Sequence, residues 1–64
     1  GSFKKIKDRR LKDLGIDAHE LKAEYVGKQG VSRYDLYKDT DTNKIWIFRK
    51  GGKGEGIETH VIIE

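Results

Sequence analysis

A chain of 64 residues that contains no cysteine has to fold by packing alone. Disulfides and thiolate zinc sites, which hold many small domains together, are both excluded. A chain of this length buries only about 60% of the surface that its unfolded form exposes, so we expect one core, regular elements and short loops. No apolar run approaches the roughly 18 residues of a membrane-spanning helix. Gly1 and Ser2 resemble a cloning scar, and residues 3–64 are expected to form a single domain.

The charged residues are unevenly distributed along the chain. The net charge is +3, but residues 1–12 contain six lysines and arginines against one acid, Asp8. Residues 13–43 contain four bases and seven acids, and residues 44–64 contain four bases and three acids. Two basic clusters therefore flank an acidic middle, which favours a polyanionic partner such as nucleic acid. The alternative is that the lysines only keep a small domain soluble.

The first half of the chain has helical spacing and helix-capping residues. Four apolar residues within 3–14 share one face, which predicts a helix that Gly15 ends. Asp17 followed by Glu20 is a capping-box pattern, and it predicts a second helix that runs to about Val26. We therefore expect two consecutive helices before any sheet.

The second half of the chain has the period of two that is typical of strands. Strands are predicted at three segments, 31–38, 44–50 and 57–63. Four glycines within residues 51–56 predict a flexible loop between the last two strands. This order of elements predicts an α+β fold, in which two N-terminal helices pack on a three- to four-stranded antiparallel meander sheet.

Alternation within the middle predicted strand separates two kinds of apolar side chain. Ile45 and Ile47 lie on one side, and Trp46 and Phe48 lie on the other. If the isoleucines face the helices, the two rings lie on an open face of the sheet beside Tyr37. Rings next to lysines suit the stacking of nucleic-acid bases, and they suit a protein partner equally well.

His19 is the residue best suited to move protons. It falls in the first turn of the second predicted helix, with Lys22 on the same flank. Imidazole changes its charge near neutral pH, so it can take a proton from a ribose 2′-hydroxyl or return one to a leaving oxygen. The alternative is that His19 is an ordinary polar residue of the surface.

Other residues can complete such a site. Lys22, Lys50 and Arg49 are candidates for stabilising charge on a phosphate oxygen. Thr59 is a candidate donor to the same oxygen, and Asp35 can orient an imidazole or act as the second proton carrier. Lys50 also begins the glycine-rich segment, which with Lys53 suits closing over a nucleic-acid backbone or serving as a simple hairpin connector.

We expect neither a metal site nor a cofactor. His19 and His60 are the only imidazoles, and the carboxylates are scattered. Asp39 and Asp41 lie close together, but in a predicted turn, where aspartates commonly bond the backbone. The site needs no metal for RNA, because the 2′-hydroxyl of RNA is itself the nucleophile.

Several short motifs resemble a family of bacterial polymorphic toxins. They are Ile16-Asp-Ala-His-Glu-Leu-Lys22, Arg33-Tyr-Asp-Leu-Tyr-Lys-Asp39, Lys50-Gly-Gly-Lys-Gly-Glu55 and Thr59. In this order, over about residues 4–60, they resemble polymorphic toxin type 33, a predicted ribonuclease. The resemblance implies a fold of the barnase–EndoU–colicin–RelE kind. It also implies a place at the C-terminus of a large secreted effector of the contact-dependent inhibition or Rhs kind.

The resemblance further implies which residues are functional. The positions that match the family motifs are His19, Lys22, Asp35, Lys50 and Thr59. The family often has proline where this chain has Arg49 and Glu58, which leaves the roles at those two places open. With the residue chemistry above, the predicted catalytic set is His19, Asp35, Lys50 and Thr59. The predicted substrate-binding set is Lys22, Arg49, Lys53 and Trp46.

These observations lead to the hypothesis of a metal-independent endoribonuclease toxin. It would cut RNA, with tRNA as one candidate, through attack of the 2′-hydroxyl, and leave a 2′,3′-cyclic phosphate. It would act as a monomer in the cytoplasm of a competing bacterium, and a cognate immunity protein would hold it inactive in the producer. Two alternatives stay open, a non-catalytic module that binds nucleic acid and a protein-interaction domain.

Overall fold

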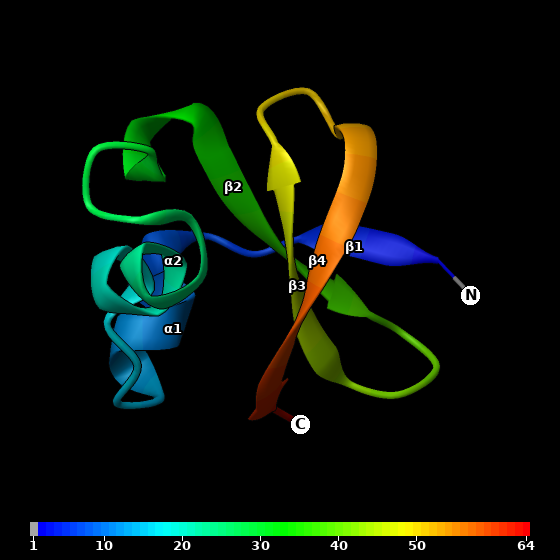
Figure 1. The fold of residues 1–64 in the computed structure, drawn as a ribbon. Coiled ribbons are helices and arrows are strands. Elements are labelled where there is room, and N and C mark those ends of the chain that lie inside the picture. Colours follow the sequence, from blue (N-terminus) through cyan, green and yellow to red (C-terminus); the bar gives the residue numbers. More distant parts are fainter. Residues whose placement is uncertain (1) are drawn as a thin grey trace.

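The fold is α+β, with two short helices on one side of a four-stranded antiparallel sheet (Figure 1). The computed structural model describes residues 2–64, so Gly1 of the predicted cloning scar lies outside the described residues. The elements in chain order are β1 (Phe3–Lys5), α1 (Asp8–Asp13), α2 (Ala18–Val26), the 3₁₀ turn η1 (Val31–Arg33), β2 (Tyr34–Asp39), β3 (Lys44–Arg49) and β4 (Lys53–Ile62). The strands lie in the order β1-β2-β3-β4, which confirms the predicted meander.

The predicted helix at residues 3–14 is wrong over its first five residues. Phe3–Lys5 form the edge strand β1, which pairs with β2 so that Phe3 lies opposite Asp39. The backbone N–H of Ile6 donates to the carbonyl of Leu36 at 2.9 Å and continues this pairing. Helical spacing is a local signal, and hydrogen bonds to a strand more than 30 residues away outweigh it here.

The end of α1 and the start of α2 lie where the capping residues in the sequence predict them. Gly15 has a φ of 81°, and the N–H of Ile16 donates to the carbonyl of Leu11 at 2.8 Å, as in a Schellman cap. At the start of α2, the carboxylate of Asp17 accepts from the N–H of Glu20 at 3.0 Å, which confirms the predicted cap. The helix boundaries at residues 13–18 are therefore set by capping.

The strands differ from the prediction at two places. Val31–Arg33 form η1 rather than the start of a strand, and β2 begins at Tyr34. Residues 53–56 belong to β4 rather than to a flexible loop, so the predicted loop shortens to a turn at residues 50–52. Gly56 explains why a glycine-rich segment can be a strand. A Cβ there would lie 2.5 Å from Cζ of Phe48, so only glycine lets the aromatic ring cover the strand.

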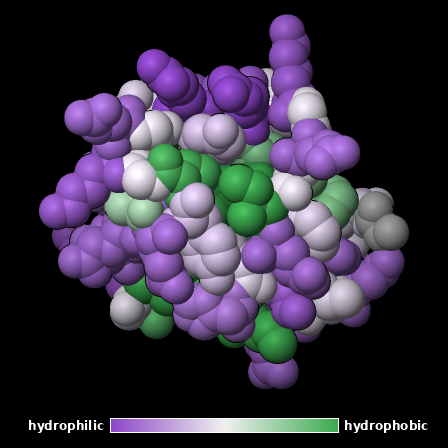
Figure 2. Space-filling model, viewed as in Figure 1, coloured by the Kyte–Doolittle hydropathy of each residue, from purple (hydrophilic) through white to green (hydrophobic). Residues whose placement is uncertain are grey.

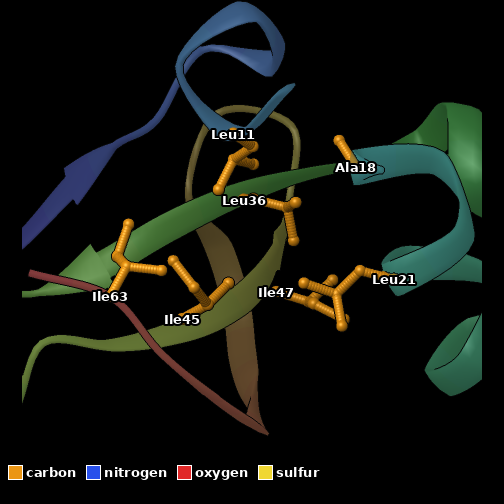
Figure 3. Packing of buried hydrophobic residues seen from close by; sticks show 7 residues of the cluster. All are labelled: Leu11, Ala18, Leu21, Leu36, Ile45, Ile47 and Ile63. Atoms are coloured by element: carbon orange, nitrogen blue, oxygen red, sulfur yellow. The ribbon is translucent and has the colours of Figure 1, made fainter. Parts of the chain in front are cut away.

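The hydrophobic core lies between the helices and one face of the sheet (Figure 3). Its members come from both helices, the two central strands and the C-terminal residues: Leu11, Ala18, Leu21, Leu36, Ile45, Ile47 and Ile63. Ile45 and Ile47 are fully buried, so the predicted alternation in β3 is confirmed and Trp46 and Phe48 lie on the face away from the helices. We call this second face the open face.

The surface is mostly hydrophilic. Figure 2 shows hydrophilic side chains over most of the view, with a small hydrophobic area near its centre. Of the large apolar side chains in the described residues, the exposed ones are Phe3, Leu14 and Ile62. No helix within residues 2–64 is long and apolar enough to span a membrane.

Candidate functional site

An aromatic cluster occupies the open face of the sheet. Phe3 of β1, Tyr37 of β2, and Trp46 and Phe48 of β3 form it, and we refer to these four rings as the aromatic cluster. The centroid of the Phe48 ring lies 5.0 Å from that of Phe3 and 5.2 Å from that of Tyr37, both edge to face. The rings of β2 and β3 are half-buried, so part of each remains open to a partner. The sequence predicted three of the four rings and missed Phe3, because it had placed that residue on a helix.

Asp35 lies next to the aromatic cluster and is held between two lysines. It stands opposite Phe48 on the open face, and its side chain is 16% exposed. Its carboxylate oxygens lie 3.4 Å from Nζ of Lys5 and 3.7 Å from Nζ of Lys50. Both ammonium groups are largely exposed, which leaves them free to meet an anion from solvent. The structure therefore brings together the predicted residues Asp35, Lys50 and Trp46, and it adds Lys5.

Four cations gather where β2 begins and β3 ends, and we call them the basic rim: Lys22, Arg49, Lys50 and Lys53. The ammonium of Lys22 donates to the carbonyl of Tyr34 at 3.1 Å. The guanidinium of Arg49 lies 5.4 Å from the centre of the Tyr34 ring, at cation–π distance. Arg49 also pairs in register with Lys53 across the β3–β4 hairpin. Three cations of the basic rim thus lie against Tyr34 or Asp35, and Lys53 lies beside Arg49.

Thr59 lies in the core rather than on the open face. Its side chain is buried, and its hydroxyl donates to the carbonyl of Ile45 at 2.7 Å. The hydroxyl oxygen of Thr59 also accepts from the N–H of Val61 at 3.2 Å. These bonds fall where the register between β3 and β4 shifts, so Thr59 supports the irregular part of β4.

His19 lies on the helical side of the molecule. It is exposed in the first turn of α2 and lines a hollow of about 500 Å³ together with residues of α1, among them Asp8 and Lys12. No hydrogen bond or ion pair among the described residues joins it to Asp35 or Lys50. Its link to the rest of the predicted site is Lys22, one helical turn away, whose ammonium reaches the residue before Asp35.

Within residues 2–64, His60 has hydrogen-bonding and charged partners and His19 has none. The hydroxyl oxygen of Tyr25 lies 2.6 Å from Nδ1 of His60, within hydrogen-bond distance, and it accepts from the backbone N–H of His60 at 3.0 Å. The carboxylate of Glu24 lies 3.7 Å from the same ring nitrogen. These contacts join the end of α2 to β4 across 35 residues of sequence, and no local motif signals them.

The remaining carboxylates do not gather into a site. Within the described part of the chain, no three His, Asp or Glu side chains lie close enough together to hold a metal ion. Asp39 bonds its own turn, because its side chain accepts from the N–H of Asp41 at 2.8 Å. Its carbonyl accepts from the N–H of Asn43 at 2.7 Å, so the turn role predicted for Asp39 is confirmed.

Comparison with known proteins gives one match. No curated protein and no solved structure matches the chain. Residues 2–64 match the family described as Bacterial toxin 33, which agrees with the toxin motifs in the sequence. Because this match spans the whole described chain, the protein belongs to the Bacterial toxin 33 family.

Proposed function

We propose that the domain is a metal-independent endoribonuclease toxin. The observation that carries this proposal is Asp35, a carboxylate held between two exposed ammonium groups and placed beside the aromatic cluster. Such a group can accept a proton next to cations that bind phosphate, while the rings bind the neighbouring bases. The family is a toxin family, and RNA is the target that this combination of side chains fits best.

The proposed reaction is an internal displacement in RNA. The carboxylate of Asp35 takes the proton of a ribose 2′-hydroxyl, and the 2′-oxygen forms a bond to the adjacent phosphorus. The bond from phosphorus to the 5′-oxygen breaks, and that oxygen takes a proton from a general acid. The ammonium of Lys50 stabilises the negative charge that builds up on the phosphoryl oxygens. The products are a 2′,3′-cyclic phosphate and a 5′-hydroxyl.

The general acid has to approach from the other side of the phosphate. An in-line displacement puts the attacking and leaving oxygens on opposite sides of phosphorus, so base and acid flank the reacting group. Asp35 approaches from the open face, and His19 lies on the helical side, beyond Lys22 of the basic rim. We assign His19 as the acid for an RNA chain that crosses the basic rim between the two faces.

The other predicted residues receive binding or positioning roles. Lys22, Arg49 and Lys53 of the basic rim bind phosphates that flank the cut bond. Trp46 stacks on a base, together with Tyr37 and Phe48. Thr59 is a positioning residue, because its hydroxyl bonds the backbone of β3 and so holds the strand that presents Trp46.

Membership of a toxin family supports a proposal for the biological setting. A toxin of this kind would be delivered as part of a larger secreted effector and would act on RNA, including tRNA, in the cytoplasm of a competing bacterium. A cognate immunity protein would block the site in the producing cell. We also propose that the domain acts as a monomer, since the proposed site needs no residue beyond those of a single chain.

A cleavage assay separates this function from its main alternative. The aromatic cluster beside lysines also suits a module that only binds nucleic acid. Total tRNA is incubated with the domain in EDTA, and the ends of the fragments are analysed. Fragments with 2′,3′-cyclic phosphate ends support the nuclease. Intact tRNA that nevertheless binds with a steep salt dependence would favour the binding module.

A further inference from the structure

A second positively charged site lies at the opposite end of β2 from the basic rim. A hollow of about 340 Å³ opens between the β1 edge of the sheet, the start of α1 and the C-terminus. Five basic residues line it: Lys4, Lys5, Lys7, Arg10 and Lys38. Ile6 and Ile63 supply its apolar walls, and Glu64 is the one acidic residue among its lining. We call this the basic hollow.

The pairing of two lysines in the basic hollow is unfavourable for the free protein. Lys4 and Lys38 stand directly opposite each other in the β1–β2 ladder. Lys38 also pairs with Ile45, which is buried in the core. Both lysines therefore lie on the same face of the sheet as the helices, at a part of that face that the helices do not cover. Like charges directly opposite in an antiparallel pair destabilise a sheet. No ion pair among the described residues neutralises either lysine.

Such an arrangement is stabilised when an anion binds between the charges. Lys7 and Arg10 approach the same hollow from the other wall, so a phosphate there meets cations from two elements. Four of the five basic residues belong to the N-terminal cluster of residues 1–12, which the candidate active site uses only through Lys5, and the fifth, Lys38, comes from β2.

We infer that the basic hollow binds a backbone phosphate of RNA at a distance from the cut bond, an inference that rests on the proposed ribonuclease function. Lys5 connects the two places, because it lines the hollow and its ammonium pairs with Asp35 on the open face. An RNA chain that lies across the aromatic cluster and continues over the edge strand β1 reaches the hollow next. This continuity favours RNA over an acidic protein as the occupant.

The test compares two double variants with the same reduction in positive charge. Lys4→Gln with Lys38→Gln empties the hollow of its opposed pair, and Arg9→Gln with Lys28→Gln removes two exposed charges outside it. The probe is a short single-stranded RNA whose 2′-hydroxyls are methylated, so that it binds without being cut. Binding is measured by fluorescence anisotropy over a series of salt concentrations.

We expect the hollow variant to bind the probe roughly tenfold more weakly, with a salt slope reduced by about 0.7 for each phosphate that the protein no longer neutralises. Its melting temperature should stay equal to the parent's or rise, because a repulsion has been removed. The control variant should change affinity little. Equal reductions in affinity for both variants would overturn the inference, because they would show an effect of net charge alone.

Two further outcomes separate this inference from the proposed function, and a third separates RNA from an acidic protein as the occupant. If the parent cuts RNA but the hollow variant binds the probe like the parent, the inference fails and the nuclease stands. If the parent cuts nothing but probe binding depends on the hollow, the nuclease fails and the phosphate site stands. Poly-glutamate is tested in the same assay as a substitute for an acidic protein. If the hollow variant loses affinity only for poly-glutamate and not for the RNA probe, the occupant is an acidic protein and the inference fails.

Discussion

Asp35 is flanked by two lysines, one on each side of β2. Lys5 reaches it from β1, and Lys50 reaches it from the turn that follows β3. Both lysine side chains are 61% exposed, so these ion pairs add little to stability. Their effect is to keep a carboxylate and two cations together at the edge of the aromatic cluster. In the proposed reaction, an RNA phosphate draws the two lysines away from Asp35 and leaves the carboxylate free to act as a base.

Lys50 should matter far more for cleavage than an ordinary surface lysine. Lys50→Ala removes the charge that stabilises the transition state in the proposed reaction, and we expect cleavage to slow by about 10²–10³-fold. The control is Lys28→Ala, which removes the same charge from the exposed turn after α2. Single-turnover rates on tRNA make the comparison. Equal rates for the two variants would remove Lys50 from the reaction.

His19 can be tested specifically as the acid. His19→Ala should slow cleavage by about 10²–10⁴-fold. The defect should largely disappear on a substrate with sulfur in place of the 5′-bridging oxygen, because a thiolate leaves without being protonated. A variant that cuts the natural substrate at the parental rate would show that His19 is not the acid.

At the level of secondary-structure elements, local interactions set the boundary between the helices, and distant interactions set strand β1. The boundary between α1 and α2 is set within a few residues by the Gly15 turn and the Asp17 cap. Strand β1 is set by hydrogen bonds to β2 and by contacts of the Phe3 ring with Trp46 and Phe48. The cap and the cluster can therefore be tested separately.

Removing the α2 cap should weaken the fold measurably. Asp17→Ala leaves the N–H of Glu20 without its side-chain acceptor, which should cost about 0.5–2 kcal/mol of unfolding free energy. Urea unfolding followed by circular dichroism gives this value. Asp13→Ala, at the exposed end of α1, serves as the control. An unchanged midpoint for Asp17→Ala would contradict the cap.

Gly56 should be intolerant of even the smallest side chain. In Gly56→Ala the new methyl group would meet the rings of Phe48 and Trp46 at 2.5 and 2.9 Å, so both rings must shift. We expect a decrease in stability of roughly 1–3 kcal/mol and a changed Trp46 fluorescence spectrum. The neighbouring exposed substitution Glu55→Ala should leave both nearly unchanged. Parental stability in Gly56→Ala would mean that the rings do not rest on β4.

Over the molecule as a whole, the sequence predicts what depends on near neighbours. The caps, the alternation in β3 and the order of elements from α1 to β4 depend on short segments of sequence, and they are confirmed. The expectation that no strand precedes the helices is wrong, because β1 comes first. Strand β1 and the Lys5–Asp35 ion pair depend on residues about 30 positions apart, so no local pattern reveals them. The same holds for the contact of Tyr25 with His60.

The candidate site was predictable as a set of residue types but not as an arrangement. The toxin motifs point to His19, Asp35 and Thr59, yet the structure distributes these three over the helical side, the open face and the core. Strand alternation predicted the open-face position of Trp46. The same alternation cannot predict which face of the sheet Thr59 occupies, because the register between β3 and β4 shifts.

The carboxylate of Asp35 on the open face is the proposed base of an RNA-cleaving site. The most direct test of this role is the single-turnover rate of tRNA cleavage in EDTA, measured for the parent domain and for Asp35→Asn. Asp13→Asn is the charge-matched control. We predict that the parent and the control cut tRNA, and that Asp35→Asn is about 10²–10⁴-fold slower while it remains folded. Parental rates for Asp35→Asn, or a parent that cuts tRNA only when a divalent metal is added, would contradict the proposed mechanism.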